Sequence, residues 1–142
     1  MKLGFLTSTG VVGGTITSFF GGWCSALTTL IMFMLADYIS GILLAGVFKN
    51  SPKSKDGGLD SKVGAKGLCK KIGILVLVSI SYRIDLILGT DYIKECVIFG
   101  FIANETLSIT ENIGLMGVPL PNIIKKAISI LNERSDKNEL QG

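Results

Sequence analysis

The sequence predicts an all-α integral membrane protein with three to four transmembrane helices and a C-terminal amphipathic helix. Three observations carry this prediction. The mean hydropathy is +0.54 with only 18% charged residues, residues 24 to 48 hold one charge before Lys49, and the 142 residues include 18 glycines. A bilayer core takes about 20 apolar residues to cross, and glycines let membrane helices approach closely. The length suits a single domain, residues 1 to 142.

The segment from residue 24 to 48 is the clearest span, and it carries Asp37 near its middle. An acid at the centre of a membrane helix costs roughly 2.5 to 3.5 kcal/mol on insertion scales, so it faces a partner, a pore or a cavity. The alternative is a protonated or hydrogen-bonded acid that only holds a bundle together. Gly41 and Ala45 follow Asp37 at steps of four, which places a small, polar face against other protein.

The segment from residue 3 to 20 is uncharged but rich in Gly, Ser and Thr. Gly10 and Gly14 have the spacing of a small-residue helix contact face. Because its apolar character is modest, the chain is expected to have either three spans or four. Lys2 followed by an apolar run resembles a signal peptide, but no A-x-A cleavage site follows, so we expect this segment to be retained.

Residues 49 to 71 form a predicted linker with seven lysines and two aspartates, interspersed with Pro, Ser and Gly. A lysine excess in a short loop next to a span marks the cytoplasmic side. The loop could also bind anionic lipid headgroups. Nucleic-acid binding is not expected, because the linker has no interleaved aromatic residues and no folded platform.

Two further spans are predicted, at residues 72 to 89 and 96 to 116. The first of them contains Arg83 and Asp85, which need partners inside a membrane. The second has a stripe of polar residues at steps of three and four, which is typical of a helix that lines a polar interior. The stripe consists of Asn104, Glu105, Ser108, Glu111 and Asn112.

The last predicted span ends in a turn at Pro119 and Pro121, because proline cannot continue a helix. A short amphipathic helix is expected at residues 121 to 133, lying on the inner membrane surface or against a neighbour. With four spans, both termini and the basic linker are cytoplasmic. With three spans, the N-terminus lies outside or on the outer surface.

Counting residues from the cytoplasmic ends of the predicted spans gives the depth of each charge. Asp37, Arg83 and Glu105 all come to roughly 18 Å at 1.5 Å per residue. A buried arginine with a carboxylate on a neighbouring helix makes both charges tolerable. The sequence therefore predicts that Arg83 pairs with Asp37 or Glu105, within one chain or between chains.

The composition argues against metal, cofactor and enzyme chemistry. The chain has no histidine, and Cys24, Cys69 and Cys96 have no metal-ligand spacing. No pair of nucleophile and base is evident. We therefore expect no metal, no cofactor and no enzymatic activity.

Four motifs carry a family resemblance: GGW at residues 21 to 23, ADYISG at 36 to 41, GLCKKIGIL at 67 to 75, and above all NETLSITENIGLMGVPLP at 104 to 121. Together they resemble the toxin secretion/phage lysis holin family. The resemblance implies a protein that oligomerises in the bacterial cytoplasmic membrane and opens a timed lesion for an endolysin or toxin. It points to the following residues: Asp37, Glu105, Ser108, Glu111, Asn112, Pro119 and Pro121. Cys24 departs from the pattern, since many relatives have an aspartate after GGW.

Two other function classes remain open at this point. A small transporter or ion-channel subunit could use Asp37 and Glu105 for cation or proton coupling. A structural membrane scaffold for a partner enzyme would cause neither leak nor lysis. For a holin, the expected partners are the lipid bilayer, further copies of the chain, and an endolysin or toxin.

Overall fold

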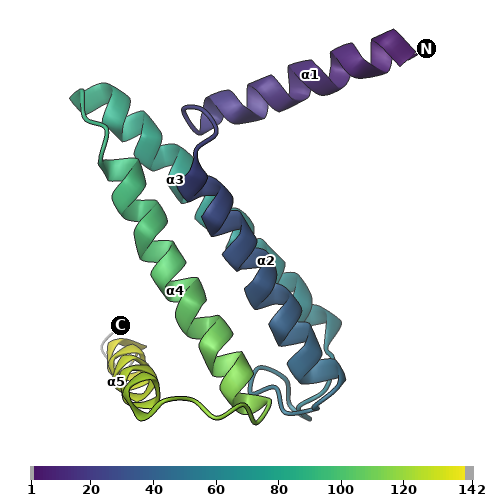
Figure 1. Cartoon of the computed structure of the whole chain (residues 1–142), viewed down its shortest axis with the longest axis vertical. Coiled ribbons are helices and arrows are strands. Elements are labelled where there is room, and N and C mark those ends of the chain that lie inside the picture. Colours follow the sequence, from purple (N-terminus) through teal and green to yellow (C-terminus); the bar gives the residue numbers. More distant parts are fainter. Residues whose placement is uncertain (1, 140–142) are drawn as a thin grey trace.

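The computed structural model describes residues 2 to 139 and contains five helices in that range and no strands. The helices are α1 (Lys2–Phe19), α2 (Ser25–Gly46), α3 (Ser61–Leu88), α4 (Ile93–Leu115) and α5 (Asn122–Glu139). This confirms the all-helical prediction. Helices α2, α3 and α4 run side by side as one elongated bundle, whereas α1 points away from one end of it (Figure 1).

The bundle is held together by residues that recur every seven positions. In α3 the buried residues include Lys71, Val78 and Asp85, and the buried residues of α4 are Ile98, Glu105 and Asn112. A seven-residue repeat keeps one face of a helix against its neighbour, as in coiled coils. Helix α4 packs extensively on α2 and less on α3, and the contact between α2 and α3 is small.

The apolar core lies in the half of the bundle that contains the start of α2. Leu27, Leu30 and Met34 of α2 pack there with Val78 of α3 and Ile98 of α4. All five side chains are almost fully shielded from solvent. The other half of the bundle is polar inside, and it contains the candidate site.

The turns at the ends of the bundle follow from local sequence. Helix α2 stops before Lys49, which has a positive φ of 50°. Helix α3 begins after Asp60, whose carboxylate accepts hydrogen bonds from the backbone N–H groups of Lys62 and Val63. This is the usual way to cap a helix N-terminus. Gly89, with a φ of 66°, ends α3 in the left-handed conformation, which glycine adopts without strain.

Three expected boundaries differ from the structure. The linker expected at residues 49 to 71 ends near residue 60, because the Asp60 cap lets the lysine-containing residues 61 to 71 continue as helix. The third helix is therefore longer than residues 72 to 89. The amphipathic helix expected at residues 121 to 133 begins at Asn122 and continues to Glu139.

The number of spans also differs from the expectation when helices are judged singly. Of the described helices, α2 alone is long and apolar enough to cross a membrane by length and composition. Helices α3 and α4 include charged residues within the stretches expected to span, Arg83 and Asp85 in one and Glu105 and Glu111 in the other. Three to four transmembrane helices are therefore not established by the fold.

Candidate functional site

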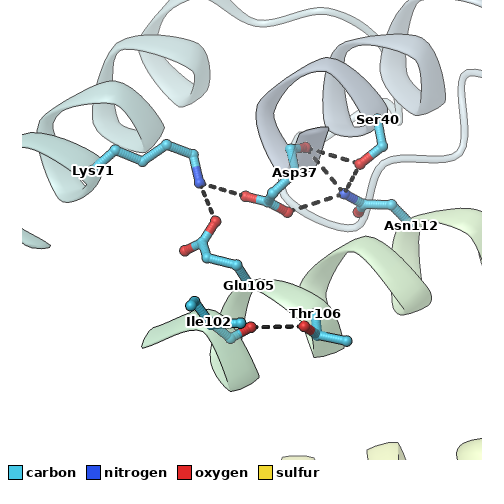
Figure 2. A network of polar contacts seen from close by, with 7 residues as sticks. All are labelled: Asp37, Ser40, Lys71, Ile102, Glu105, Thr106 and Asn112. Carbon is cyan, nitrogen blue, oxygen red and sulfur yellow. Dashed lines mark hydrogen bonds and ion pairs between the residues drawn. The ribbon is translucent and has the colours of Figure 1, made fainter. Parts of the chain in front are cut away.

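The centre of the site is Lys71, which joins two acids from two other helices. Its Nζ atom lies 2.8 Å from Oδ2 of Asp37 on α2 and 2.5 Å from Oε2 of Glu105 on α4. Figure 2 shows the ammonium group between the two carboxylates. The three side chains retain only 4 to 13% of their accessible surface. We call Asp37, Lys71 and Glu105 the charged triad.

A second group of polar side chains supports Asp37 from the other side. The Nδ2 atom of Asn112 donates a hydrogen bond to Ser40 Oγ over 2.9 Å and lies 3.3 Å from Asp37 Oδ1 (Figure 2). The Ser40 hydroxyl in turn donates to the backbone carbonyl of Asp37. Asn112 and Ser40 are both buried, so their polar atoms need these partners. The contacts fix α2 against α4 at the level of Gly41, whose position lies close to the Asn112 amide.

The triad lies at one level of the bundle. Asp37 is nine residues before the end of α2, and Lys71 and Glu105 are each ten residues from the neighbouring ends of α3 and α4. These counts correspond to roughly 14 to 15 Å along the helix axis. The opposite ends of α2 and α4 are twelve residues away, or roughly 18 Å. The triad is therefore near the middle of the bundle.

Within the single chain, Arg83 does not form the ion pair with Asp37 or Glu105 that the sequence predicted. Its side chain is exposed, and both ion pairs found among the described residues are made by Lys71. Twelve residues separate Lys71 from Arg83, which turns their side chains about 120° apart around α3 at 100° per residue. The same twelve residues place Arg83 roughly 18 Å along α3 from the level of the triad. The predicted depth of Arg83 was therefore wrong as well, because it was counted from Lys71 as the start of the span, whereas α3 begins at Ser61.

Lys71 was missed because the lysines from residue 49 to 71 look alike in sequence. A signal for it was present, however. Lys71, Val78 and Asp85 are seven apart, and with Ile74 and Ser81 between them they follow the steps of three and four that mark a buried helix face. All of them are buried or half-buried in α3. Lys71 is the first residue of this series, and its side chain faces the bundle interior.

A cavity of about 290 Å³, lined by both polar and apolar side chains, opens beside the triad. Helices α2, α3 and α4 contribute to its lining, and the turn between α2 and α3 contributes Lys53 and Asp60. Ser108 of the predicted polar stripe lines the cavity together with Glu105 and Asn112. On the far side of the triad, the apolar core closes the bundle.

Asp85 belongs to a different cluster, at the opposite end of the bundle. Its carboxylate accepts hydrogen bonds from the Thr90 hydroxyl, over 2.5 Å, and from the backbone N–H groups of Ile93 and Lys94. These N–H groups belong to the first turn of α4, where backbone N–H groups have no carbonyl partner within the helix. Asp85 therefore joins α3 to the start of α4.

The other predicted residues have varied places. Asn104 is exposed although it borders the cavity, and Glu111 lies half-buried near the turn that contains Pro119. Ala45 is buried in the bundle. A Cβ atom added at Gly10 or Gly14 would meet no other atom within 4 Å, so among the described residues the two glycines make no contact with another helix. Pro119 and Pro121 lie in the turn between α4 and α5.

Comparison with known proteins identifies the family. A model of the bacteriophage holin family matches residues 14 to 133. The chain belongs to this family. The match includes α2, α3 and α4, so the charged triad and its cavity lie inside the part of the chain that is typical of holins.

Relatives of this holin-family chain come from bacteria and a phage. An uncharacterized Listeria monocytogenes protein is 42% identical over 133 residues, with 92% of this chain and 89% of the relative covered. An uncharacterized 14.9 kDa Clostridium perfringens protein from the nagH 3' region is 34% identical and covers 87% and 89%. A probable holin of Bacillus phage phi105 is 27% identical and covers 78% and 77%. No solved structure matches.

Proposed function

We propose that this chain is a holin that oligomerises in the bacterial cytoplasmic membrane and opens a lesion through which an endolysin or toxin leaves the cell. The observation that carries the proposal is the charged triad at mid-height of a bundle with an apolar surface, in a chain of the holin family. Exposed apolar side chains cover the outside of α2 and α3, among them Leu35, Ile39, Val76 and Ile80.

The triad explains how Lys71 of α3 and Glu105 of α4 can lie inside a bilayer although both are charged. An unpaired charge inside a membrane is unfavourable, but charges that face the bundle interior and pair with each other are tolerated. Lys71 and Glu105 neutralise each other in this way, with Asp37 as a second acid. Helix α2 has 22 residues, or about 33 Å, which suits a hydrocarbon core about 30 Å thick.

In the proposed topology α2, α3 and α4 cross the membrane, and the basic turn between α2 and α3 faces the cytoplasm. Lysines concentrate there and at the start of α5, in agreement with the positive-inside rule. Helix α1 then lies outside or along the outer surface, unless it crosses as a fourth span. Labelling of a Lys2→Cys variant by an impermeant thiol reagent distinguishes the two. Labelling from outside supports three spans, whereas labelling from inside supports four.

The proposed opening exposes polar faces that the single chain hides. Glu105, Ser108 and Asn112 lie on one face of α4 and are covered by α2 and α3. If neighbouring copies replace these internal contacts, the same face can line a water-filled opening. A packed bundle with two alternative arrangements is the kind of element that switches abruptly.

Induced expression in a bacterium tests the proposal. Membrane potential and escape of a co-expressed cytoplasmic wall hydrolase are followed in the same culture. We expect abrupt depolarisation after a delay, with release of the hydrolase. A Glu105→Leu variant should shift the delay, because it removes one partner of Lys71. An Arg83→Leu variant is the matched control, since this exposed side chain has no part in the triad.

Other outcomes would favour the other function classes. Depolarisation without release of the hydrolase would indicate a small channel or transporter subunit instead of a holin. Neither depolarisation nor release would indicate a scaffold. An unchanged delay in the Glu105→Leu variant would contradict the part assigned to the triad while leaving lysis itself intact.

A further inference from the structure

The charged triad contains one more acid than base. Lys71 supplies one positive charge, whereas Asp37 and Glu105 supply two negative charges. The interior of the bundle therefore has an excess of one negative charge when all three groups are ionised. A lone buried charge is strongly unfavourable, so a compensating positive charge is expected to bind or the group takes up a proton.

Part of the triad remains open to a ligand. Lys71 bonds to one oxygen of Glu105, Oε2, and no described residue donates a hydrogen bond to its other oxygen. The Glu105 side chain is 96% buried, so this oxygen can be satisfied only from the adjoining cavity. Ser108 and Asn112, which line the same cavity, offer further oxygen atoms.

The cavity provides a route for a small ligand from one side of the bundle only. It has room for several water molecules, each of which occupies about 30 Å³ in the liquid, and it borders the turn that contains Lys53 and Asp60. Toward the opposite end, Leu30, Met34, Val78 and Ile98 fill the bundle with apolar side chains. Access is therefore from the end that the lysine-rich turn assigns to the cytoplasm.

The remaining charged groups around the cavity do not supply the missing charge. Lys53 and Lys70 border it, but both are exposed and neither forms an ion pair with a described residue. Asp60 is exposed and caps α3. Lys53 acts on Asp37 through its charge, but this is the weakest of the interactions of Asp37, after those with Lys71 and Ser108. Exposed charges of this kind are largely screened by water and salt. Tyr38 also borders the cavity.

We propose that the triad is a binding site for a single small positive charge, a proton or a monovalent metal ion, that enters from the cytoplasmic end. This goes beyond the proposed lytic function, because the site exists in the closed single chain. The bound charge neutralises the second acid and stabilises the bundle. Loss of that charge leaves two acids that share one lysine.

The test uses the purified full-length chain in detergent micelles, with thermal unfolding followed by circular dichroism. Sodium or potassium chloride replaces N-methyl-D-glucamine chloride at constant ionic strength, and each series is repeated between pH 8 and pH 5. A metal-ion site predicts that the unfolding temperature rises by a few degrees with the metal ion, since a ligand of the folded state stabilises it. A proton site predicts no effect of the metal ion but a rise as the pH falls.

Two variants decide whether the effect belongs to the triad. Glu105→Gln and Asp37→Asn each leave one lysine with one acid. In both variants the unfolding temperature should therefore no longer depend on the metal ion or on pH in the way that it does in the wild-type chain. Glu111→Gln is the matched control, because Glu111 is on α4 but outside the cavity, and it should keep the dependence. Infrared spectra add a direct readout: a proton site predicts a protonated carboxyl band that is lost in Glu105→Gln or Asp37→Asn.

The proposal is overturned if the wild-type chain responds to neither metal ion nor pH. It is also overturned if both triad variants respond as strongly as the wild-type chain. Neither result depends on lysis, so a failure here is separate from a failure of the proposed holin function.

Discussion

The side chain of Lys94, at the start of α4, donates a hydrogen bond to the backbone carbonyl of Phe20, directly after α1, over 3.0 Å. The same ammonium group lies 5.5 Å from the centre of the Tyr82 ring. The hydroxyl of Ser79 donates a second hydrogen bond, to the carbonyl of Phe19. Two side chains of the bundle therefore hold the C-terminal end of α1, whose remaining length extends away from the bundle (Figure 1).

Removal of both donors should free α1. A Lys94→Met, Ser79→Ala double variant is expected to broaden the distances between α1 and α4. Spin labels on a Gly13→Cys position and on the native Cys96, with Cys24 and Cys69 replaced by serine, allow the measurement. Lys62→Met is the control, since Lys62 lies at the opposite end of the bundle. An unchanged distance distribution in the double variant would show that other contacts hold α1.

Replacement of Lys71 should destabilise the bundle more than any other single lysine change. Lys71→Met leaves Asp37 and Glu105 buried without their cation, and loss of one partner of a buried ion pair costs about 3 to 5 kcal/mol. The free energy of unfolding in detergent measures the effect. Lys70→Met, at the neighbouring exposed position, should change it little. Equal stability of the two variants would mean that the triad is not buried as described.

The triad also shows how far sequence reasoning reached. Counting residues along two segments placed Asp37 and Glu105 at one depth, and the structure brings both to the same ammonium group. Their cation was assigned to Arg83 because depth in the third helix was counted from Lys71, which in the structure lies ten residues inside α3. Lys71 was hidden by the Asp60 cap, which converts almost half of an apparent lysine-rich loop, residues 61 to 71, into helix.

A larger side chain at Gly41 should separate α2 from α4. A Cβ atom at this position would lie 3.8 Å from Nδ2 of Asn112, so an isoleucine there must displace the amide or the helix. Overpacking of this kind typically costs about 1 to 3 kcal/mol. Gly73→Ile is the control, since a Cβ atom at Gly73, within α3, would meet no atom within 4 Å. Thermal unfolding of both variants should show a lower midpoint for Gly41→Ile, and equal midpoints would contradict this packing.

The two glycines between α1 and α2 should differ in their tolerance of alanine. Gly21 and Gly22 have φ angles of 70° and 98°, so both substitutions are strained. A Cβ atom at Gly21 would in addition overlap the ring of Tyr82, whereas one at Gly22 would meet nothing. Gly21→Ala should therefore lower the unfolding temperature more than Gly22→Ala. In a Tyr82→Ala background the difference should disappear, and its persistence would exclude the ring as the cause.

The seven-residue spacing of Lys71, Val78 and Asp85 against Ile98, Glu105 and Asn112 has a consequence for how the chain selects one fold. Apolar helices can slide along each other by a turn with little penalty. Here a shift by one turn, about 5.4 Å, would move the Lys71 ammonium away from Glu105, and in one direction it would place the ammonium against Phe101 and Ile102, which pack on the apolar core. Buried polar groups are best known for fixing the register of packed helices. The triad thus specifies a single register of α3 against α4. A bundle with an entirely apolar interior would lose this register before it lost its stability.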